Sequence, residues 1–183
     1  SCAKLWMGAA NLEIRQHDLA AARTIFGTSL GMCPEGSNCK AKVYAAYISV
    51  ERQLGEIERC RKLFAGYLAN NPAAVQPYIA FAEMEQGMQE TERARAILEV
   101  AVSQNVLDQP EQIWKYYINF ECSQEEFDRA RELYKRLLDR TKNVRVWLNF
   151  AKFERDVCKN ASSSRAVIEE AEAHFKAKTV GAV

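Results

Sequence analysis

Residues 114–121 read Trp-Lys-Tyr-Tyr-Ile-Asn-Phe-Glu, and their side chains follow a spacing that occurs five times in the chain. An aromatic residue leads, a second aromatic residue follows three positions later, an apolar residue stands at the sixth position and glutamate at the seventh. The first copy has alanine as its second member. The leading aromatic residues and glutamates are Trp6 and Glu13, Tyr44 and Glu51, Tyr78 and Glu85, Trp114 and Glu121, and Trp147 and Glu154. A pattern that recurs every 33 to 38 residues indicates a repeat protein.

A second pattern lies downstream of each glutamate, and residues 94–98, Ala-Arg-Ala-Ile-Leu, are typical of it. Its arginine follows the glutamate by 10 residues in the first four copies and by 11 residues in the last. The five arginines are Arg23, Arg61, Arg95, Arg131 and Arg165. Each repeat therefore carries an aromatic residue, a glutamate and an arginine in a nearly constant register.

Both patterns predict helices, because spacings of three, six and seven residues fall on one side of a helix, whereas a strand requires alternation. Prolines and short glycine-containing stretches separate the predicted helices. One helix pair cannot bury its apolar faces alone, so we expect the pairs to stack. The sequence predicts an all-α protein, a right-handed solenoid of antiparallel helix pairs that occupies residues 1–183. Its five repeats are expected at about 4–36, 41–73, 76–108, 112–142 and 145–179.

The composition is that of a folded, water-soluble protein, with 48% hydrophobic and 27% charged residues. Lysine and arginine number 25 against 24 aspartates and glutamates, so the net charge of +1 provides no general attraction to nucleic acid or anionic membranes. No apolar run reaches the length of a membrane span. The chain begins without methionine, and we interpret it as a piece of a longer protein.

The six cysteines form no Cys-x-x-Cys motif, and the two histidines lie far apart in sequence. Cys33 and Cys39 are the only close pair, and they flank a loop. A metal site needs more ligands than these two thiols. A disulfide is the second alternative, but scattered cysteines in helix-rich chains are typical of reduced, intracellular proteins. We therefore expect reduced thiols and neither a metal nor a cofactor.

The repeated glutamates and arginines are interpreted as structural pairs rather than catalytic groups. A carboxylate on the packed side of a helix needs a cation, and the arginine of its own or a neighbouring repeat can supply one. Five identical active sites in one chain make no chemical sense. The three tryptophans could stack on RNA bases, but they occupy repeat positions that Tyr44 and Tyr78 fill elsewhere, which favours packing between helices.

One basic cluster could contact RNA phosphates. The alternative is that its first two arginines belong to the repeat and the others solvate the end of a helix, where cations are favourable. The cluster consists of Arg129, Arg131, Lys135, Arg136, Arg140, Lys142 and Arg145. Of these, Lys135, Arg136, Arg140 and Lys142 are the candidates for direct RNA contact.

The repeat pattern resembles the HAT (half-a-TPR) repeat more than the tetratricopeptide repeat, because small residues and glycine are missing from the first helix. Residues 114–121, 131–141 and 146–154 are similar to the crooked neck family of splicing factors, as are residues 27–34 and 59–64. The resemblance covers nearly the whole chain. It implies a solenoid of HAT/TPR-like helix pairs.

The same resemblance implies a non-enzymatic protein-interaction scaffold of the spliceosome-associated nineteen complex, located in the nucleus and needed for spliceosome assembly or activation. Its partners would be the Myb-like subunit of that complex and a second, larger HAT-repeat protein. Two other functions stay open, namely a HAT scaffold of another RNA-processing complex such as the pre-mRNA 3′-end cleavage factor, and an RNA-binding solenoid. Self-association through exposed terminal faces is also expected.

Overall fold

The computed structural model describes residues 2–141 and 143–180, and within these residues it contains helices and no β-strand. The all-α prediction is therefore confirmed. None of the helices in this described part is both long and apolar enough to cross a membrane. The helices are α1 (Cys2–Arg15), α2 (Leu19–Met32), α3 (Asn38–Gln53), α4 (Ile57–Asn70), α5 (Val75–Gly87), α6 (Thr91–Ser103), α7 (Pro110–Ser123), α8 (Phe127–Thr141), α9 (Val144–Lys152), the π-helical turn η1 (Phe153–Val157) and α10 (Ala161–Val180).

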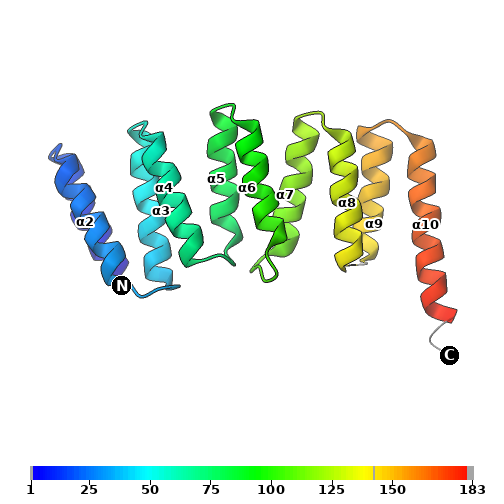
Figure 1. The fold of residues 1–183 in the computed structure, drawn as a ribbon, viewed down its shortest axis with the longest axis horizontal. Coiled ribbons are helices and arrows are strands. Elements are labelled where there is room, and N and C mark those ends of the chain that lie inside the picture. The colour runs from blue at the N-terminus through cyan, green and yellow to red at the C-terminus, as the bar shows by residue number, and fades with distance from the viewer. Residues whose placement is uncertain (1, 142, 181–183) are drawn as a thin grey trace. The chain divides into compact units, whose positions relative to one another are not determined.

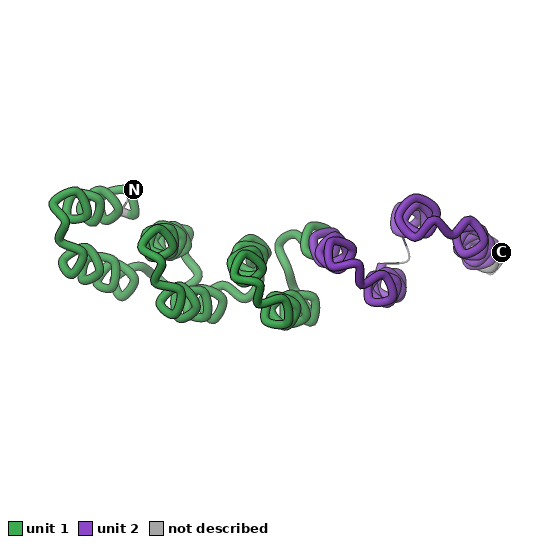
Figure 2. Tube along the Cα trace, turned by 90° about the horizontal axis from the view of Figure 1, so that it is seen from above, with its two compact units in different colours: residues 1–113 green, residues 114–183 purple. Residues whose placement is uncertain are grey.

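The chain divides into two compact units, residues 1–113 and residues 114–183 (Figure 2). In the first unit α1 packs against α2, α3 against α4, and α5 against α6, so that each pair is a helical hairpin (Figure 1). Successive hairpins touch through α2 and α3 and through α4 and α5. In the second unit α9 packs against both α8 and α10. Stacking of helical hairpins in sequence order defines an α-solenoid.

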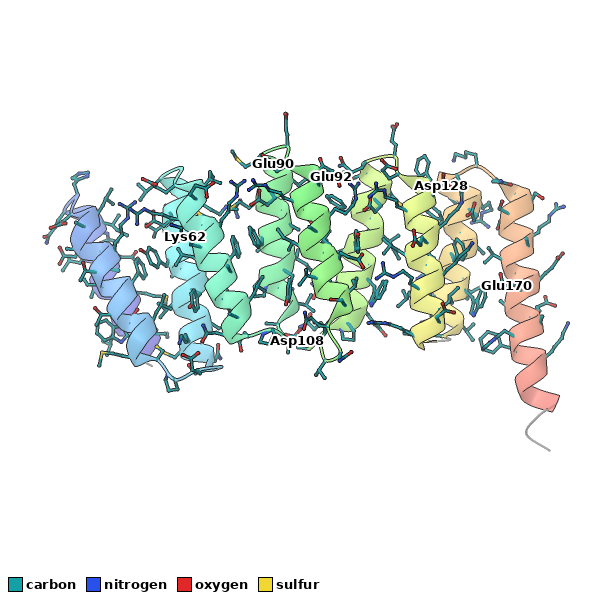
Figure 3. The ribbon with its side chains drawn as sticks, viewed as in Figure 1. Lys62, Glu90, Glu92, Asp108, Asp128 and Glu170 are labelled. Atoms are coloured by element: carbon teal, nitrogen blue, oxygen red, sulfur yellow. The ribbon has the colours of Figure 1, made fainter. Side chains whose placement is uncertain are left out.

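Polar side chains start several of these helices by accepting a backbone N–H that has no partner within the helix. Asp18 accepts from Ala21 N at 2.9 Å at the start of α2. Before α9, Asn143 accepts from Arg145 N at 3.0 Å. A longer-range cap, Asp108 (labelled in Figure 3), lies beyond α6 and accepts from Val75 N at 3.0 Å at the start of α5. This last contact ties both ends of the third hairpin together.

The turn inside each hairpin has the same backbone conformation in four copies. A residue four positions after the repeat glutamate has a left-handed φ of 58° to 74°. The next N–H then donates to the glutamate carbonyl at 2.9 to 3.0 Å, which is the pattern of a Schellman C-cap. Only one of the four left-handed residues is glycine. They are His17, Gly55, Gln89 and Glu125.

The fifth hairpin has one additional residue between its repeat glutamate and its repeat arginine. Here the repeat glutamate, Glu154, lies within the π-helical turn, whose wider ring accommodates one residue more than an α-helical turn. The left-handed residue is Lys159, five positions after Glu154, and Asn160 N donates to Glu154 O at 2.8 Å. The π-helical turn therefore explains why the spacing from glutamate to arginine is 11 residues in this copy alone.

Stacked aromatic rings join the second helix of one hairpin to the first helix of the next. Each stack joins the ring three residues after a repeat arginine to the ring three residues after a leading aromatic residue. Distances between ring centroids are 4.7 Å for Phe26 and Tyr47, 4.8 Å for Phe64 and Phe81, and 4.9 Å for Tyr134 and Phe150. A stacked pair contributes about 0.5–1.5 kcal/mol beyond the burial of its area.

Candidate protein-binding surface

The repeat arginine of one hairpin binds the repeat glutamate of the following hairpin through two parallel hydrogen bonds. Both bonds come from the guanidinium Nε and Nη2 atoms, the bidentate geometry that suits a carboxylate. The donor–acceptor distances are 2.8 and 2.8 Å for Arg23 and Glu51, 2.8 and 2.7 Å for Arg61 and Glu85, and 2.7 and 3.1 Å for Arg131 and Glu154. Of the two partners considered from the sequence, the structure selects the neighbouring repeat.

These glutamates are buried, with side chains 0 to 2% exposed, whereas the arginines retain some access to water. Hydrogen bonds to the glutamates raise the pKa values of Arg23, Arg61 and Arg131, so the guanidinium groups stay charged. An acidic residue three positions earlier also holds two of these arginines, at 2.6 Å from Glu58 to Arg61 and from Asp128 to Arg131. These three carboxylates are therefore buried and bound by arginine, and they are unavailable for catalysis.

The remaining repeat residues occupy several environments. Glu121 is buried, and Arg95 is nearly buried and contacts Glu92. Glu13 in the first copy is half-buried and Arg165 in the last is exposed, and neither forms an ion pair with a described residue. Because each pair joins an arginine to the next glutamate, the first glutamate and the last arginine have no counterpart within residues 2–141 and 143–180.

The leading aromatic residues belong to the core in four of the five copies. Tyr44, Tyr78, Trp114 and Trp147 are 3 to 8% exposed, and Trp6 is half-buried. Side chains this deeply buried cannot offer a ring face to a nucleotide base. Their geometry therefore agrees with packing between helices rather than with base stacking.

The basic cluster is only partly available for binding. The guanidinium carbons of Arg136 and Arg140 each lie 5.7 Å from the centroid of the Trp114 ring, within the range of a cation–π interaction. Arg131 is occupied by Glu154. Lys135 is exposed, whereas Lys142 lies outside the described residues. Two of the four candidate RNA contacts thus stabilise α8 against α7.

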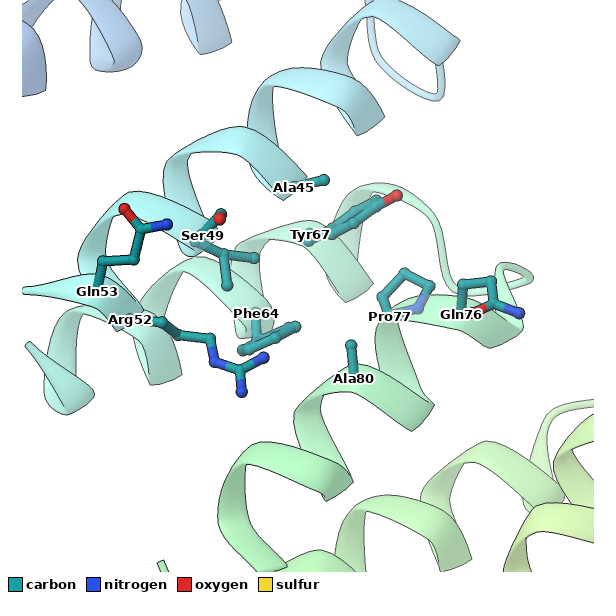
Figure 4. A pocket seen from close by; sticks show the side chains of 10 residues that line it. Ala45, Ser49, Arg52, Gln53, Phe64, Tyr67, Gln76, Pro77 and Ala80 are labelled. Carbon is teal, nitrogen blue, oxygen red and sulfur yellow. The ribbon is translucent and has the colours of Figure 1, made fainter. Parts of the chain in front are cut away.

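A hollow of about 410 Å3 opens between α3, α4 and α5 in the first unit (Figure 4). Ile48, Phe64 and Tyr67 provide apolar surface. Pro77 and Ala80 line the side of α5. The volume lies within the range of about 300–1,000 Å3 that is typical of ligand-binding clefts.

Polar groups stand at the rim of this hollow. Ser49 and Gln53 extend from α3, Gln76 extends from α5, and the guanidinium of Arg52 points across the opening toward Phe64 (Figure 4). Arg52 is exposed and forms no ion pair with any carboxylate of the described residues. The hollow therefore combines an apolar floor with one available cation, which suits a segment carrying an apolar side chain beside a carboxylate.

The sequence patterns gave no indication of this hollow, because they follow the residues that the repeats share. Arg52 stands directly after the repeat glutamate, at a position where the other four copies have Ile14, Gln86, Cys122 and Arg155. Because this position varies among the repeats, no signal in the sequence marked the hollow.

A second hollow, of about 440 Å3, lies between α9 and α10 and is almost wholly apolar. Leu148 and Ile168 are exposed at its edge, and Trp147 forms part of its wall. Trp147 Nε1 is buried and has no hydrogen-bond partner among the described residues.

The described residues of the chain include no cluster of three side chains that could hold a metal ion.

The stacked helical hairpins define this chain as an α-solenoid of the tetratricopeptide-like class. A solved structure of a tetratricopeptide repeat protein from Parabacteroides merdae has the same fold, with a TM-score of 0.51 and 13% sequence identity over 96% of this chain and 67% of that protein. A family profile for the PRP39 N-terminal HAT repeat matches residues 17–154. The chain therefore belongs to the HAT-repeat family.

Two relatives illustrate the similarity to crooked neck proteins. The chain is 51% identical over 152 residues to pre-mRNA-splicing factor CLF1 of Paracoccidioides brasiliensis, which covers 83% of this chain and 22% of that protein. It is 47% identical over 171 residues to human Crooked neck-like protein 1, which covers 92% of this chain and 20% of that protein. The chain spans about a fifth of the length of these curated relatives, and the resemblance inferred from the repeats is confirmed.

Proposed function

We propose that this chain is a non-catalytic scaffold segment of a pre-mRNA splicing factor, and that it works by binding other proteins. The observation that carries the proposal is the identity of 45 to 51% with proteins named as pre-mRNA-splicing factor CLF1 over most of the chain. The geometry supports it, because three of the repeat glutamates are buried against arginines of the preceding hairpin. Polar side chains around the hollow, such as Arg52 and Gln76, are exposed.

More specifically, we propose that the chain is part of the nineteen complex of the spliceosome and is therefore located in the nucleus. The expected partners are the Myb-like subunit and a second, larger HAT-repeat scaffold. Loss of these repeats would impair assembly or activation of the spliceosome rather than a chemical step. The near-zero net charge favours recognition by shape and local polar contacts over long-range attraction.

Within this function, the hollow between α3 and α5 is the proposed contact surface. Solenoids bind partners along their exposed helix faces. A partner carboxylate on Arg52 and an apolar side chain over Phe64 would complete an interface that the chain itself leaves open. Reversing the charge of Arg52 should therefore weaken binding of a partner by about tenfold, which is about 1.4 kcal/mol.

The test is capture of proteins from nuclear extract with the immobilised chain, followed by identification of the retained proteins. Arg52→Glu is compared with Arg15→Glu, a matched charge reversal at an exposed arginine of α1 outside the hollow. Splicing proteins of the nineteen complex should be retained by the unaltered chain and by Arg15→Glu, and strongly depleted by Arg52→Glu. Equal retention of these proteins by both variants would show that the hollow is not the contact surface.

The same capture separates the other two functions. Recovery of 3′-end cleavage proteins in place of splicing proteins would move the chain to that machinery. Treatment of the extract with ribonuclease provides the second comparison. If retention is lost after this treatment, and also in Lys135→Glu, the chain binds RNA and the protein-scaffold proposal is wrong.

A further inference from the structure

Cys33 and Cys39 bring their sulfur atoms together at the connection between the first and second hairpins. Cys33 caps the end of α2, where its N–H donates to Ser29 O at 3.0 Å, and Cys39 is the second residue of α3. Their Sγ atoms are 2.7 Å apart and share a hydrogen bond, but no disulfide bond joins them. A disulfide bond is about 2.05 Å long, so a movement of about 0.7 Å would complete it.

The loop between the two cysteines has a fixed conformation that holds this approach. Gly36 adopts a left-handed φ of 65°, which glycine tolerates without steric cost. Ser37 accepts from Lys40 N at 3.2 Å and thereby caps α3. Lys40 Nζ also contacts Glu35 at 2.5 Å. Because the loop is already ordered, closing the bond requires little further loss of conformational freedom.

We propose that Cys33 and Cys39 form a reversible disulfide site, which a small-molecule disulfide such as oxidised glutathione closes. The thiolate of Cys39, the more exposed of the two residues, attacks glutathione disulfide to form a mixed disulfide and releases one glutathione. The thiolate of Cys33 then attacks the Cys39 sulfur, forms the Cys33–Cys39 bond and releases the second glutathione. The two thiol protons pass to the two glutathiones, so the protein loses two electrons and glutathione disulfide gains them.

The other described cysteines are poorly suited to this exchange. Cys60 is fully buried, and burial raises the pKa values of the Cys60, Cys122 and Cys158 thiols. A raised pKa lowers the thiolate fraction at neutral pH, and the thiolate is the reacting species. Oxidation at low concentrations of glutathione disulfide should therefore select the pair at the α2–α3 connection.

The bond would act on the junction between two repeats. It would join the last turn of α2 to the first turn of α3, and these helices also meet through the Arg23–Glu51 pair. A covalent link between the two ends of the loop should reduce local opening of the loop and of the adjoining helix ends. The amides of Cys33 and of residues 35–41 should exchange at least about tenfold more slowly after oxidation.

The experiment uses the reduced chain carrying Cys2→Ser, equilibrated with glutathione disulfide and then treated with acid to stop exchange. Cleavage after glutamate divides the loop at Glu35, so fragments containing Cys33 and Cys39 stay linked only if the disulfide has formed. Reduction should separate them, and the intact chain should regain two hydrogens. Cys33→Ser should instead stop at the mixed disulfide and keep one glutathione on Cys39, whereas Cys60→Ser should behave like the parent chain.

Fragments that separate without reduction would overturn the proposal, as would a mixed disulfide that persists on Cys39 while Cys33 is present. A bond from either cysteine to Cys60, Cys122 or Cys158 would also contradict it. If Cys33→Ser does not fold, the mapping of linked fragments in the parent chain decides the question by itself.

Discussion

Replacing Arg61 by alanine tests whether the buried glutamates depend on arginines from the preceding hairpin. Arg61 supplies two hydrogen bonds to Glu85, at 2.8 and 2.7 Å, and the Glu85 side chain is 1% exposed. Arg61→Ala would leave this carboxylate buried without its cation. Because an isolated buried charge interacts unfavourably with its surroundings, we expect a loss of about 3–5 kcal/mol in the free energy of unfolding.

Two comparisons isolate the cause of that loss. Arg61→Met with Glu85→Met removes both charges and fills the space with apolar atoms, so it should lie within about 2 kcal/mol of the parent chain. Arg93→Ala removes an exposed ion pair to Glu90, at 3.7 Å, from side chains 56% and 49% exposed. Its expected loss is below about 1 kcal/mol.

Urea unfolding followed by circular dichroism measures these differences, and helix content before denaturation shows that each variant is folded. We expect Arg61→Ala to be much less stable than Arg93→Ala. The loss of free energy of unfolding in the double variant should be smaller than the sum of the losses in Arg61→Met and Glu85→Met measured separately. If Arg61→Ala is no less stable than Arg93→Ala, or if the two single effects simply add, the paired charges do not hold the repeats together.

Three further predictions concern the hairpin turns and a half-buried tyrosine, Tyr134. Gln89→Gly should raise the free energy of unfolding by about 0.5–1 kcal/mol in urea titration, because Gln89 has a left-handed φ of 62°, and Gly55→Ala should lower it. Deletion of Asp156 from the π-helical turn should restore the ten-residue spacing and cost below about 1 kcal/mol, whereas loss of helix content would show that the turn is not a simple insertion. Burial raises the pKa of Tyr134 to about 12, so its hydroxyl binds its proton more tightly in the folded chain. The resulting stability should be complete below pH 10 and disappear as the pH approaches 12, and ultraviolet titration of tyrosinate should lack its last step in Tyr134→Phe.

The sequence alone determined the all-α fold class and the pairing of helices into repeats. Spacings of three and seven residues, such as those from Trp114 to Tyr117 and Glu121, depend only on the geometry of a single helix. The same local pattern identified the HAT-repeat family. The extra residue between Glu154 and Arg165 was also visible, although its accommodation in a π-helical turn was not.

Tertiary structure decided every contact that joins residues of different helices. Arg61 binds Glu85 of the next repeat, 24 residues away, and Phe64 stacks on Phe81, which also belongs to the next repeat. The approach of Cys33 to Cys39 and the hollow beside Arg52 are further results of this kind. A periodic pattern shows which face of a helix is buried, but it contains no information on how far the neighbouring helix is shifted or rotated. Packing of side chains between helices sets that shift and rotation, and thereby selects which charge meets which partner.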